Sequence, residues 1–465
     1  MLALPVVLVA VYLTTLDFFV ANLALPSIRA ELGAGEAAVQ LVIAGYGTAY
    51  AAGLIVAGRL GDLYGHRRIF VIGLVLFTAA SGLCGLAPGT AALVPARVAQ
   101  GVAAALLAPQ VLVLLGVLRQ GAARERAFGW YGTTVGVAGV GGQAIGGLLV
   151  AADPMGLGWR ACFLVNVPIG IAAAVLAVRV LPRVPATGDR RDLDRAGAAL
   201  VAGGLVAVVL PLAAGREQGW PWWTWACLGA AAPLLAAFAR RQRALAGRGR
   251  TPLLDLRVFE ASGFAAGLVA VGLLFGTSAG LSFVMALYLQ DGLGLGPLAA
   301  GCVTTALNAG FFVASFRAHR VPRVAGGLTL VGGLVLLASL AGRDAASAGS
   351  AGWGTAAAVA GALAVAGAGM GLLMSPLLAS VVPRGRGGAA AGVLGTVQEA
   401  GGVIGGTLAG AAFFGALGDG WGDAAASGIG VSVVMALGVL GHCVIRARRR
   451  LDDSRESEEL AVPAA

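Results

Sequence analysis

Long apolar runs alternate with short polar segments along the whole chain. Each run has about 20 residues or more, which is the length an α-helix needs to cross the hydrocarbon core of a bilayer. Because backbone groups cannot stay unpaired in lipid, such runs are expected to be helical. The pattern therefore predicts an all-α integral membrane protein. Its fourteen spans are expected at roughly 4–25, 38–58, 69–88, 91–116, 129–151, 161–181, 195–214, 222–239, 262–289, 297–316, 323–341, 354–379, 388–416 and 425–445.

Two arginine-rich linkers, residues 183–195 and 240–254, bracket the seventh and eighth spans. Without that pair, six spans remain on each side, as expected of a fold built from two related halves. A short repeat supports this arrangement: Gly136, Gly142, Ile145, Gly146 and Gly147 recur as Gly395, Gly401, Ile404, Gly405 and Gly406. The expected domains are an N-terminal six-helix bundle (1–182), a linker with two additional helices (183–257), a C-terminal six-helix bundle (258–446) and a disordered cytoplasmic tail (447–465).

The composition agrees with a membrane protein. Of the 465 residues, 58% are hydrophobic and only 12% are charged, and the mean hydropathy is +0.88. A water-soluble domain of this size is more polar. The 75 glycines fit this class, because small residues let helices approach closely in lipid. On the fifth and thirteenth spans, helix-packing roles are predicted for Gly142, Gly146, Gly147, Gly401, Gly405 and Gly406.

The charge is basic and unevenly distributed. The formal net charge is +10, and all 32 basic residues are arginine. Alternate threading of the spans places Arg29, Arg160, Arg216 and Arg343 on one side, Arg97 within a span, and every other arginine on the opposite side. By the positive-inside rule the arginine-rich side is cytoplasmic, so both termini are expected there. The partners of these arginines are then lipid headgroups rather than nucleic acid.

The sequence contains no signature of several other kinds of chemistry. The five cysteines lie singly, without the spacing of a metal site or a disulfide framework. Gly139–Gly147 is only a weak match to a nucleotide-binding loop, and no catalytic triad is recognisable. We predict no enzyme activity, metal or cofactor. The first apolar run has neither a basic segment before it nor a cleavage site, so we expect a retained helix rather than a signal peptide.

Three ionisable residues fall clearly within spans: Asp17, Arg97 and Glu399. Each charge at the centre of a membrane helix costs about 2.5 to 3.5 kcal/mol on insertion scales. A carboxylate in a partly dry cavity can be neutralised by a proton and can exchange that proton for a cationic or polar ligand. We predict proton coupling by all three residues, with Asp17 as the first choice. The alternative is a structural ion pair or a water-accessible helix end.

Two of these residues have further alternatives. Arg97 is expected to tune a facing acid, but it also lies close enough to a helix end to extend its guanidinium to the interface. Glu399 has small neighbours that leave room for water or ligand, although a simple interhelical hydrogen bond is also possible. The predicted polar and aromatic lining of a central cavity is Asp17, Phe18, Asn22, Gln100, Gln143, Asn166, Asn308, Gln398 and Glu399.

A polar, glycine-rich segment from Gly58 to Arg68 separates the second and third spans. Gly58 and Gly65 permit tight turns, and the carboxylate of Asp62 can pair with a basic group or a helix end. Arg67 and Arg68 follow directly. We predict a cytoplasmic gating loop that acts as a hinge with a latch.

These motifs together resemble the major facilitator superfamily, specifically its fourteen-helix drug:proton antiporter family. The segment Gly58 to Arg68 resembles the family's loop between helices two and three. The surroundings of Asp17, from Leu16 to Pro26, resemble its acidic first-helix motif. Arg97 to Gly101 resembles its fourth-helix motif, which the family links to proton transfer.

Two further stretches are similar to the same family. Trp159 to Gly170 resembles the start of helix six in the fourteen-helix branch and is the most specific single match. Gly142 to Gly147 resembles the fifth-helix antiporter motif, but Gln143 stands where the family usually has proline. This difference adds a polar group where the family has a helix distortion.

The resemblance implies a monomeric exporter in the bacterial inner membrane, driven by proton influx without a cofactor, that moves amphipathic drugs or antibiotics by alternating access. Asp62 is then expected to pair with Arg124 or Arg126 when the cavity faces outward. Two alternatives remain. One is an exporter of a single endogenous metabolite, such as a self-made antibiotic. The other is a non-transporting membrane sensor, for which the chain offers only short loops and a short tail.

Overall fold

The computed structural model describes residues 2–118, 122–183, 194–215, 218–250, 252–254, 256, 263–318, 320–344, 353–381 and 387–461. Over these residues, fourteen helical segments are long and apolar enough to cross a membrane, which confirms the predicted number. The α-helices are α1 (Ala3–Leu32), α2 (Glu36–Tyr64), α3 (His66–Gly85), α4 (Thr90–Leu118), α5 (Ala122–Ala152), α6 (Ala161–Leu164), α7 (Asn166–Val180), α8 (Arg195–Ala214), α9 (Trp222–Gly247), α10 (Phe264–Leu287), α11 (Pro297–Ser315), α12 (Arg323–Asp344), α13 (Trp353–Val381), α14 (Gly387–Ala416) and α15 (Trp421–Ala461).

Short irregular elements join some of these helices. A 3₁₀ turn, η2 (Gly158–Arg160), leads into α6 and α7, and the three together form one span. A π-helical turn, η5 (Tyr288–Gly292), extends α10 by five residues. The π-helical turn places Gln290 and Asp291 just beyond the end of α10.

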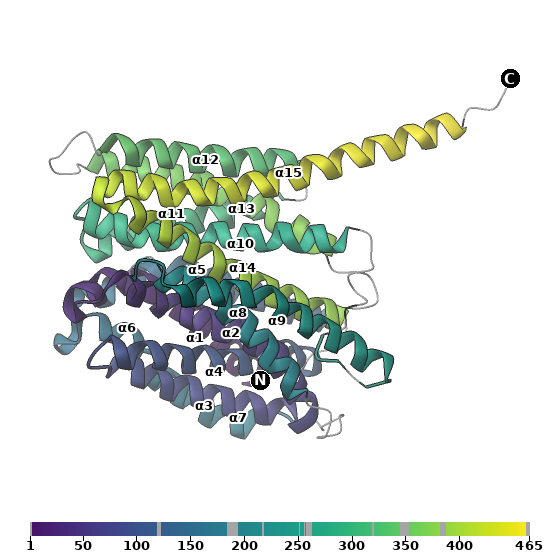
Figure 1. The fold of residues 1–465 in the computed structure, drawn as a ribbon. Coiled ribbons are helices and arrows are strands. Elements are labelled where there is room, and N and C mark those ends of the chain that lie inside the picture. Colours follow the sequence, from purple (N-terminus) through teal and green to yellow (C-terminus); the bar gives the residue numbers. More distant parts are fainter. Residues whose placement is uncertain are drawn as a thin grey trace.

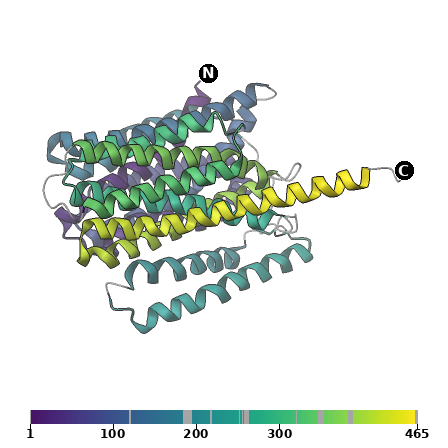
Figure 2. The ribbon, with the colours of Figure 1, turned by 90° about the horizontal axis from the view of Figure 1, so that it is seen from above.

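The helices form two groups that lie against each other (Figure 1). One group contains α1 to α7, and the other contains α10 to α15. Across the boundary α5 packs on α11, α2 on α14, and α1 on α10. The hairpin of α8 and α9 lies beside the two groups, where α8 touches both α2 and α14 (Figure 2).

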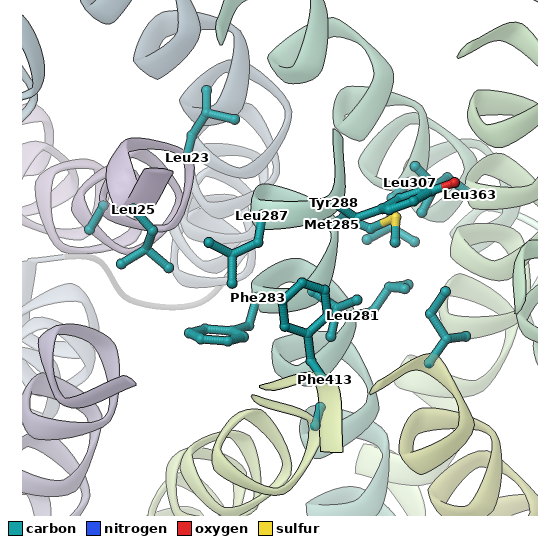
Figure 3. Close-up of a cluster of buried hydrophobic side chains, with 14 of the residues drawn as sticks. Leu23, Leu25, Leu281, Phe283, Met285, Leu287, Tyr288, Leu307, Leu363 and Phe413 are labelled. Carbon is teal, nitrogen blue, oxygen red and sulfur yellow. The ribbon is translucent and has the colours of Figure 1, made fainter. Parts of the chain in front are cut away.

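One apolar core extends across the boundary between the groups. Leu23 and Leu25 of α1 lie near Phe283 and Leu287 of α10, with Phe413 of α14 nearby (Figure 3). All five side chains are buried. Burial of such a side chain contributes about 1.5 to 3 kcal/mol when the alternative is exposure to water. In a membrane the alternative is contact with lipid, so the gain in stability comes mainly from close packing.

Several predicted packing glycines lie where two helices approach closely. Added Cβ atoms at Gly401 and Gly405 would collide with the backbone of α10, for example 2.6 Å from the Cα of Gly272. One at Gly147 would lie 2.5 Å from the carbonyl oxygen of Pro297 in α11. Gly142 and Gly146 face α1, at 3.0 Å from Phe19 Cβ and 3.2 Å from Val20 Cα. Gly406 differs, because its nearest neighbour is at an ordinary 3.9 Å.

A single methyl group at Gly401 is therefore expected to destabilise the protein. Gly401→Ala would force α14 away from α10, with a cost of about 1 to 3 kcal/mol as for other overpacked sites. The matched control is Gly402→Ala, since an added Cβ at Gly402 would lie 3.7 Å from Ala279 Cβ. Thermal unfolding in detergent measures both. Equal melting temperatures for the two variants would contradict a packing role for Gly401.

One sequence expectation about local structure is wrong. The segment Gly58 to Arg68 is not a loop: α2 continues to Tyr64, α3 begins at His66, and only Gly65 lies between them, at φ 91° and ψ 128°. That positive φ is accessible mainly to glycine. α15 extends as far as Ala461, and the predicted disorder of the tail, 447–465, stays a prediction.

Candidate functional site

The carboxylate of Asp17 is the centre of a buried polar network. Its Oδ2 accepts a hydrogen bond from Arg97 Nη1 at 2.6 Å. Its Oδ1 accepts hydrogen bonds from Gln100 Nε2 at 2.7 Å and from Asn166 Nδ2 at 3.0 Å. Four residues predicted from the sequence thus meet at one point, although they come from α1, α4 and the start of α7.

Arg97 does not extend to the membrane interface. Its side chain is 0% exposed, which overturns that alternative. Nη1 also donates to Gln100 Oε1 at 2.6 Å, and Nε donates to the carbonyl oxygen of Val42 at 3.0 Å. The guanidinium lies over the rings of Tyr46 and Phe163, at 4.4 Å and 5.4 Å from their centroids. These contacts compensate a charge that has lost its hydration.

The sequence analysis missed two members of the network. Ser81 Oγ accepts hydrogen bonds from Gln100 Nε2 at 2.7 Å and Asn166 Nδ2 at 3.3 Å. Cys84 Sγ donates to Gln100 Oε1 at 3.5 Å. Both lie on α3, and the signal that would have found Ser81 is a hydroxyl group within an apolar span. In this arrangement Asp17 already has three donors and is not open to a substrate.

Glu399 has a different environment. It lies midway along α14 and remains partly exposed. Within the part of the chain that the structure describes, no hydrogen bond or ion pair reaches its carboxylate. A carboxylate without a charged partner is destabilised in a low-dielectric medium, and binding of a proton removes that cost. Glu399 is therefore the carboxylate that this structure leaves available.

Tyrosines connect the surroundings of the two acids. Tyr46 and Tyr50, one turn apart on α2, stack with ring centroids 5.9 Å apart. Tyr46 is within electrostatic range of Asp17, Arg97 and Glu399, and Tyr50 is within range of Glu399. The sequence analysis missed both tyrosines. Their signal is two phenol groups four residues apart within the second span, which places them on one helix face.

The remaining predicted lining residues do not all face a common space. Asn22 is buried and donates to the carbonyl oxygen of Phe18 in its own helix at 2.8 Å. Asn308 on α11 donates to the carbonyl oxygen of Gly139 on α5 at 2.8 Å, so it joins the two halves. Gln143 is buried on α5, where α5 packs on α11. Gln398 is partly buried beside Glu399.

Three contacts join the halves near the end of α1. Arg29 of α1 forms an ion pair with Asp291 of η5 at 3.7 Å. Its guanidinium also lies 5.9 Å from the ring centroid of Phe414 in α14. Gln290 Nε2 donates to the carbonyl oxygen of Leu23 at 2.9 Å. Together with the approach of Gly147 to Pro297, these contacts join the two groups of helices at one end of the molecule.

The predicted hinge residues lie at the C-terminal end of α2 and the start of α3. Asp62 pairs with Arg59 at 3.7 Å and with His66 Nε2 at 3.6 Å. His66 Nδ1 lies 2.7 Å from Gln110 Oε1, and Gln110 Nε2 donates to the carbonyl oxygen of Ala57 at 2.8 Å. Gln110, which the sequence analysis missed, therefore ties α4 to the junction of α2 and α3.

The arginines that follow the junction behave differently from each other. Arg67 donates to the carbonyl oxygen of Val178 in α7, and Arg68 is exposed. The expected partners of Asp62, Arg124 and Arg126, belong to α5, but their side chains lie outside the described residues. The predicted pairing with Asp62 stays a prediction.

Comparison with known proteins assigns this arrangement to a family. The model of the Major Facilitator Superfamily matches residues 7–406. The probable actinorhodin transporter of Streptomyces coelicolor is 40% identical over 90% of this chain and 73% of its own. The tetracenomycin C resistance and export protein of Streptomyces glaucescens is 32% identical over 89% and 76%. The multidrug resistance protein Stp of Mycobacterium tuberculosis is 30% identical over 85% and 72%.

Solved structures agree at the level of the fold. A crystal structure of the peptide transporter POT in complex with sulfate covers 95% of this chain and 94% of its own, with a TM-score of 0.65 and 16% identity. An auto-inhibited POT family peptide transporter reaches a TM-score of 0.70 with 13% identity over 97% of each chain. The fourteen spans, the two groups of helices and these matches show that the chain belongs to the Major Facilitator Superfamily of membrane transporters.

Proposed function

We propose that this transporter is a proton-coupled antiporter that exports an amphipathic drug or antibiotic by alternating access. Its family consists of transporters rather than enzymes, and its relatives at 30–40% identity include proteins named for antibiotic export and drug resistance. The proton gradient would supply the driving force, and both termini would lie in the cytoplasm of a bacterial cell.

The contrast between the two membrane carboxylates carries this proposal. Asp17 is neutralised by Arg97 and is fully hydrogen-bonded, whereas Glu399 is partly exposed and has no partner among the described residues. A carboxylate that exchanges a proton for a substrate must be accessible. Its charged form must also be unfavourable when neither a proton nor a substrate is bound. We therefore assign the proton exchange to Glu399. We assign to Asp17 and Arg97 a structural role, in which their charges tune the electrostatic environment of Tyr46.

The contacts between the halves fit one state of such a cycle. Arg29, Asp291 and Gln290 lie at the end of the bundle that the arginine distribution makes the outer one. Their contacts hold that end closed, so the cavity of this state would open toward the cytoplasm. In the opposite state these contacts would break, and Asp62 would exchange its present partners for the arginines of the next cytoplasmic segment.

A transport assay in vesicles tests the proposal. Purified protein is reconstituted, the vesicle interior is made acidic, and uptake of puromycin, tetracenomycin C and a cationic dye is followed. We expect uptake of at least one compound, because protons leaving the acidic interior through the antiporter drive the compound inward. This uptake should collapse when a protonophore is added, because the protonophore dissipates the proton gradient. Uptake that is indifferent to the protonophore would contradict proton coupling.

The same assay separates two ranges of substrate. Some relatives are named for one product, such as actinorhodin or tetracenomycin C, and Stp is named for multidrug resistance. Transport of structurally unrelated compounds at similar rates would indicate a multidrug exporter. Transport of one compound alone would indicate a dedicated exporter.

A further inference from the structure

A second buried carboxylate network lies outside the transport pathway, where the α8–α9 hairpin begins and ends. Asp194 precedes α8, and its Oδ1 accepts hydrogen bonds from the backbone N–H of Gly197 at 2.9 Å and from Arg241 Nε at 2.6 Å. Its Oδ2 accepts a hydrogen bond from Gln242 Nε2 at 2.9 Å. The Asp194 side chain is 4% exposed. One carboxylate thus joins the start of α8 to the end of α9.

Gln242 extends this network to the next part of the chain. Its side chain is buried, and its Oε1 accepts hydrogen bonds from the backbone N–H groups of Leu253 at 2.7 Å and Leu254 at 3.3 Å. Leu253 and Leu254 belong to the linker that leads to α10. We call the group formed by Asp194, Arg241, Gln242 and these two backbone amides the Asp194 clasp.

The clasp is enclosed on two sides. Val201 of α8 and Phe238 of α9 form a small apolar cluster with Leu253 and Leu254. At Gly197 an added Cβ would lie 2.7 Å from Gln242 Nε2. The packing therefore leaves no room for a side chain at that position, while the Arg241 side chain remains 42% exposed.

The charge of Asp194 is maintained by its donors. Burial, the largest single influence, acts to raise the pKa of Asp194. The hydrogen bonds from Gly197 N–H, Arg241 and Gln242 together outweigh burial, so the pKa lies below its usual value. The carboxylate is ionised at neutral pH, where charge-assisted hydrogen bonds are at their strongest.

The hairpin that the clasp holds has a particular position. α8 packs on α2, which belongs to the first group of helices, and on α14, which belongs to the second (Figures 1 and 2). These two helices also pack on each other and carry Tyr50 and Glu399. Motion of one half against the other in alternating access must therefore displace α2 relative to α14 beneath α8.

We propose that α8 is a strap across the boundary between α2 and α14, and that the Asp194 clasp holds it there while the two halves move. The strap limits how far the boundary opens on the side covered by α8. It thereby keeps lipid and water out of the region around Tyr50 and Glu399. The sealing of the region around Tyr50 and Glu399 rests on the proposed transport function, whereas the position of α8 and its attachment by the Asp194 clasp do not.

Hydrogen–deuterium exchange on the full-length protein in lipid nanodiscs tests the strap without any substrate. In Asp194→Asn the carboxylate that pairs with Arg241 is lost. We expect peptides that contain Gly197, Leu253 and Leu254 to exchange faster, which shows that the clasp is open. Peptides of α2 and of residues 394–416 in α14 are also expected to exchange about threefold faster or more, because local opening spreads to packed neighbours. Peptides of α3 and α13 should be unchanged, because among the described residues α8 packs mainly on α9, α2 and α14.

Matched variants separate the strap from a general loss of stability. Gln242→Met keeps Asp194 and Arg241 but removes the hydrogen bonds to the linker. It should give the same exchange pattern more weakly, and it replaces Asp194→Asn in the experiment if that variant does not fold. Arg243→Gln, at an exposed position on the same helix end, should behave like the wild type. Faster exchange confined to the clasp peptides, with α2 and α14 unchanged, would overturn the proposal.

The transport part has its own readout. Vesicles that contain Asp194→Asn should leak protons several-fold faster than wild-type vesicles in the absence of substrate. Tight vesicles together with an open clasp would overturn the sealing role of α8. If wild-type protein shows no proton-coupled transport at all, the proposed function fails, but the exchange pattern of α2 and α14 still decides whether α8 is a strap.

Discussion

Glu399→Gln is expected to remove proton-driven export while the protein still inserts and folds. Glutamine has nearly the same shape as glutamic acid but cannot exchange a proton at neutral pH. Loss of a group that transfers protons typically lowers rates by about 100-fold or more. In vesicles with an acidic interior we expect uptake to fall by this order and to lose its dependence on pH.

The structure explains why this substitution should not unfold the protein. The Glu399 carboxylate has no hydrogen-bond or ion-pair partner among the described residues, so its replacement leaves no buried group unpaired there. Exchange of substrate across the vesicle membrane without a gradient should persist, because that reaction needs the cavity and not a net movement of protons. The combination of retained exchange and lost proton dependence identifies a coupling residue.

Two control variants sharpen the experiment. Glu399→Asp keeps a titratable group and should restore part of the proton-driven uptake. Gln398→Asn alters the adjacent polar side chain on α14 and should leave the pH dependence of uptake unchanged. If Glu399→Gln transports with the proton dependence of the wild type, Glu399 is not the coupling group and the assignment returns to Asp17.

Asp17→Asn is expected to destabilise the protein rather than simply to change its coupling. Arg97 would remain charged and 0% exposed, without the carboxylate that lies 2.6 Å away in the native protein. Removal of one partner from a buried ion pair costs about 3 to 5 kcal/mol. We therefore expect a lower melting temperature in detergent, and residual transport whose proton dependence resembles that of the wild type.

A double-mutant cycle isolates this ion pair. In Asp17→Asn/Arg97→Gln both charges are absent, and amide groups can retain part of the hydrogen bonding to Gln100 and Asn166. The double variant should regain much of the stability that either single variant loses, because the uncompensated charge is gone. Additive losses in the cycle would show that Asp17 and Arg97 act independently and would contradict the observed pairing.

The sequence alone was sufficient for the properties that depend on local composition. Windows of about 20 apolar residues specify membrane spans whatever their neighbours are, so the number of spans, fourteen, was predicted correctly. The motifs around Asp17, Arg97 and Trp159 identified the family for the same reason. The junction at Gly65 was harder, because hydropathy windows end where polar residues begin, whereas α2 and α3 continue through those polar residues.

Contacts between helices were decided only by the tertiary structure. The sequence placed Asp17, Arg97 and Glu399 in the membrane with Asp17 as the first choice for proton coupling, but it did not show which side chains face each other. Asp17 and Arg97 are 80 residues apart in the chain, and they meet because α1 and α4 pack with those faces together. Glu399 lies on α14, where no described residue pairs with it.

The physical reason is that insertion of a helix into the membrane depends on neighbouring residues in the sequence, whereas pairing of side chains depends on residues far apart in the sequence. Transfer of a helix into lipid depends on the sum of its own side chains, which the sequence contains directly. Whether a buried carboxylate is neutralised by an arginine or by a proton depends on the rotation and depth of neighbouring helices. Only the packed structure sets these, and it reversed the order of the two acids: Asp17 is paired, and Glu399 is the group left to exchange a proton.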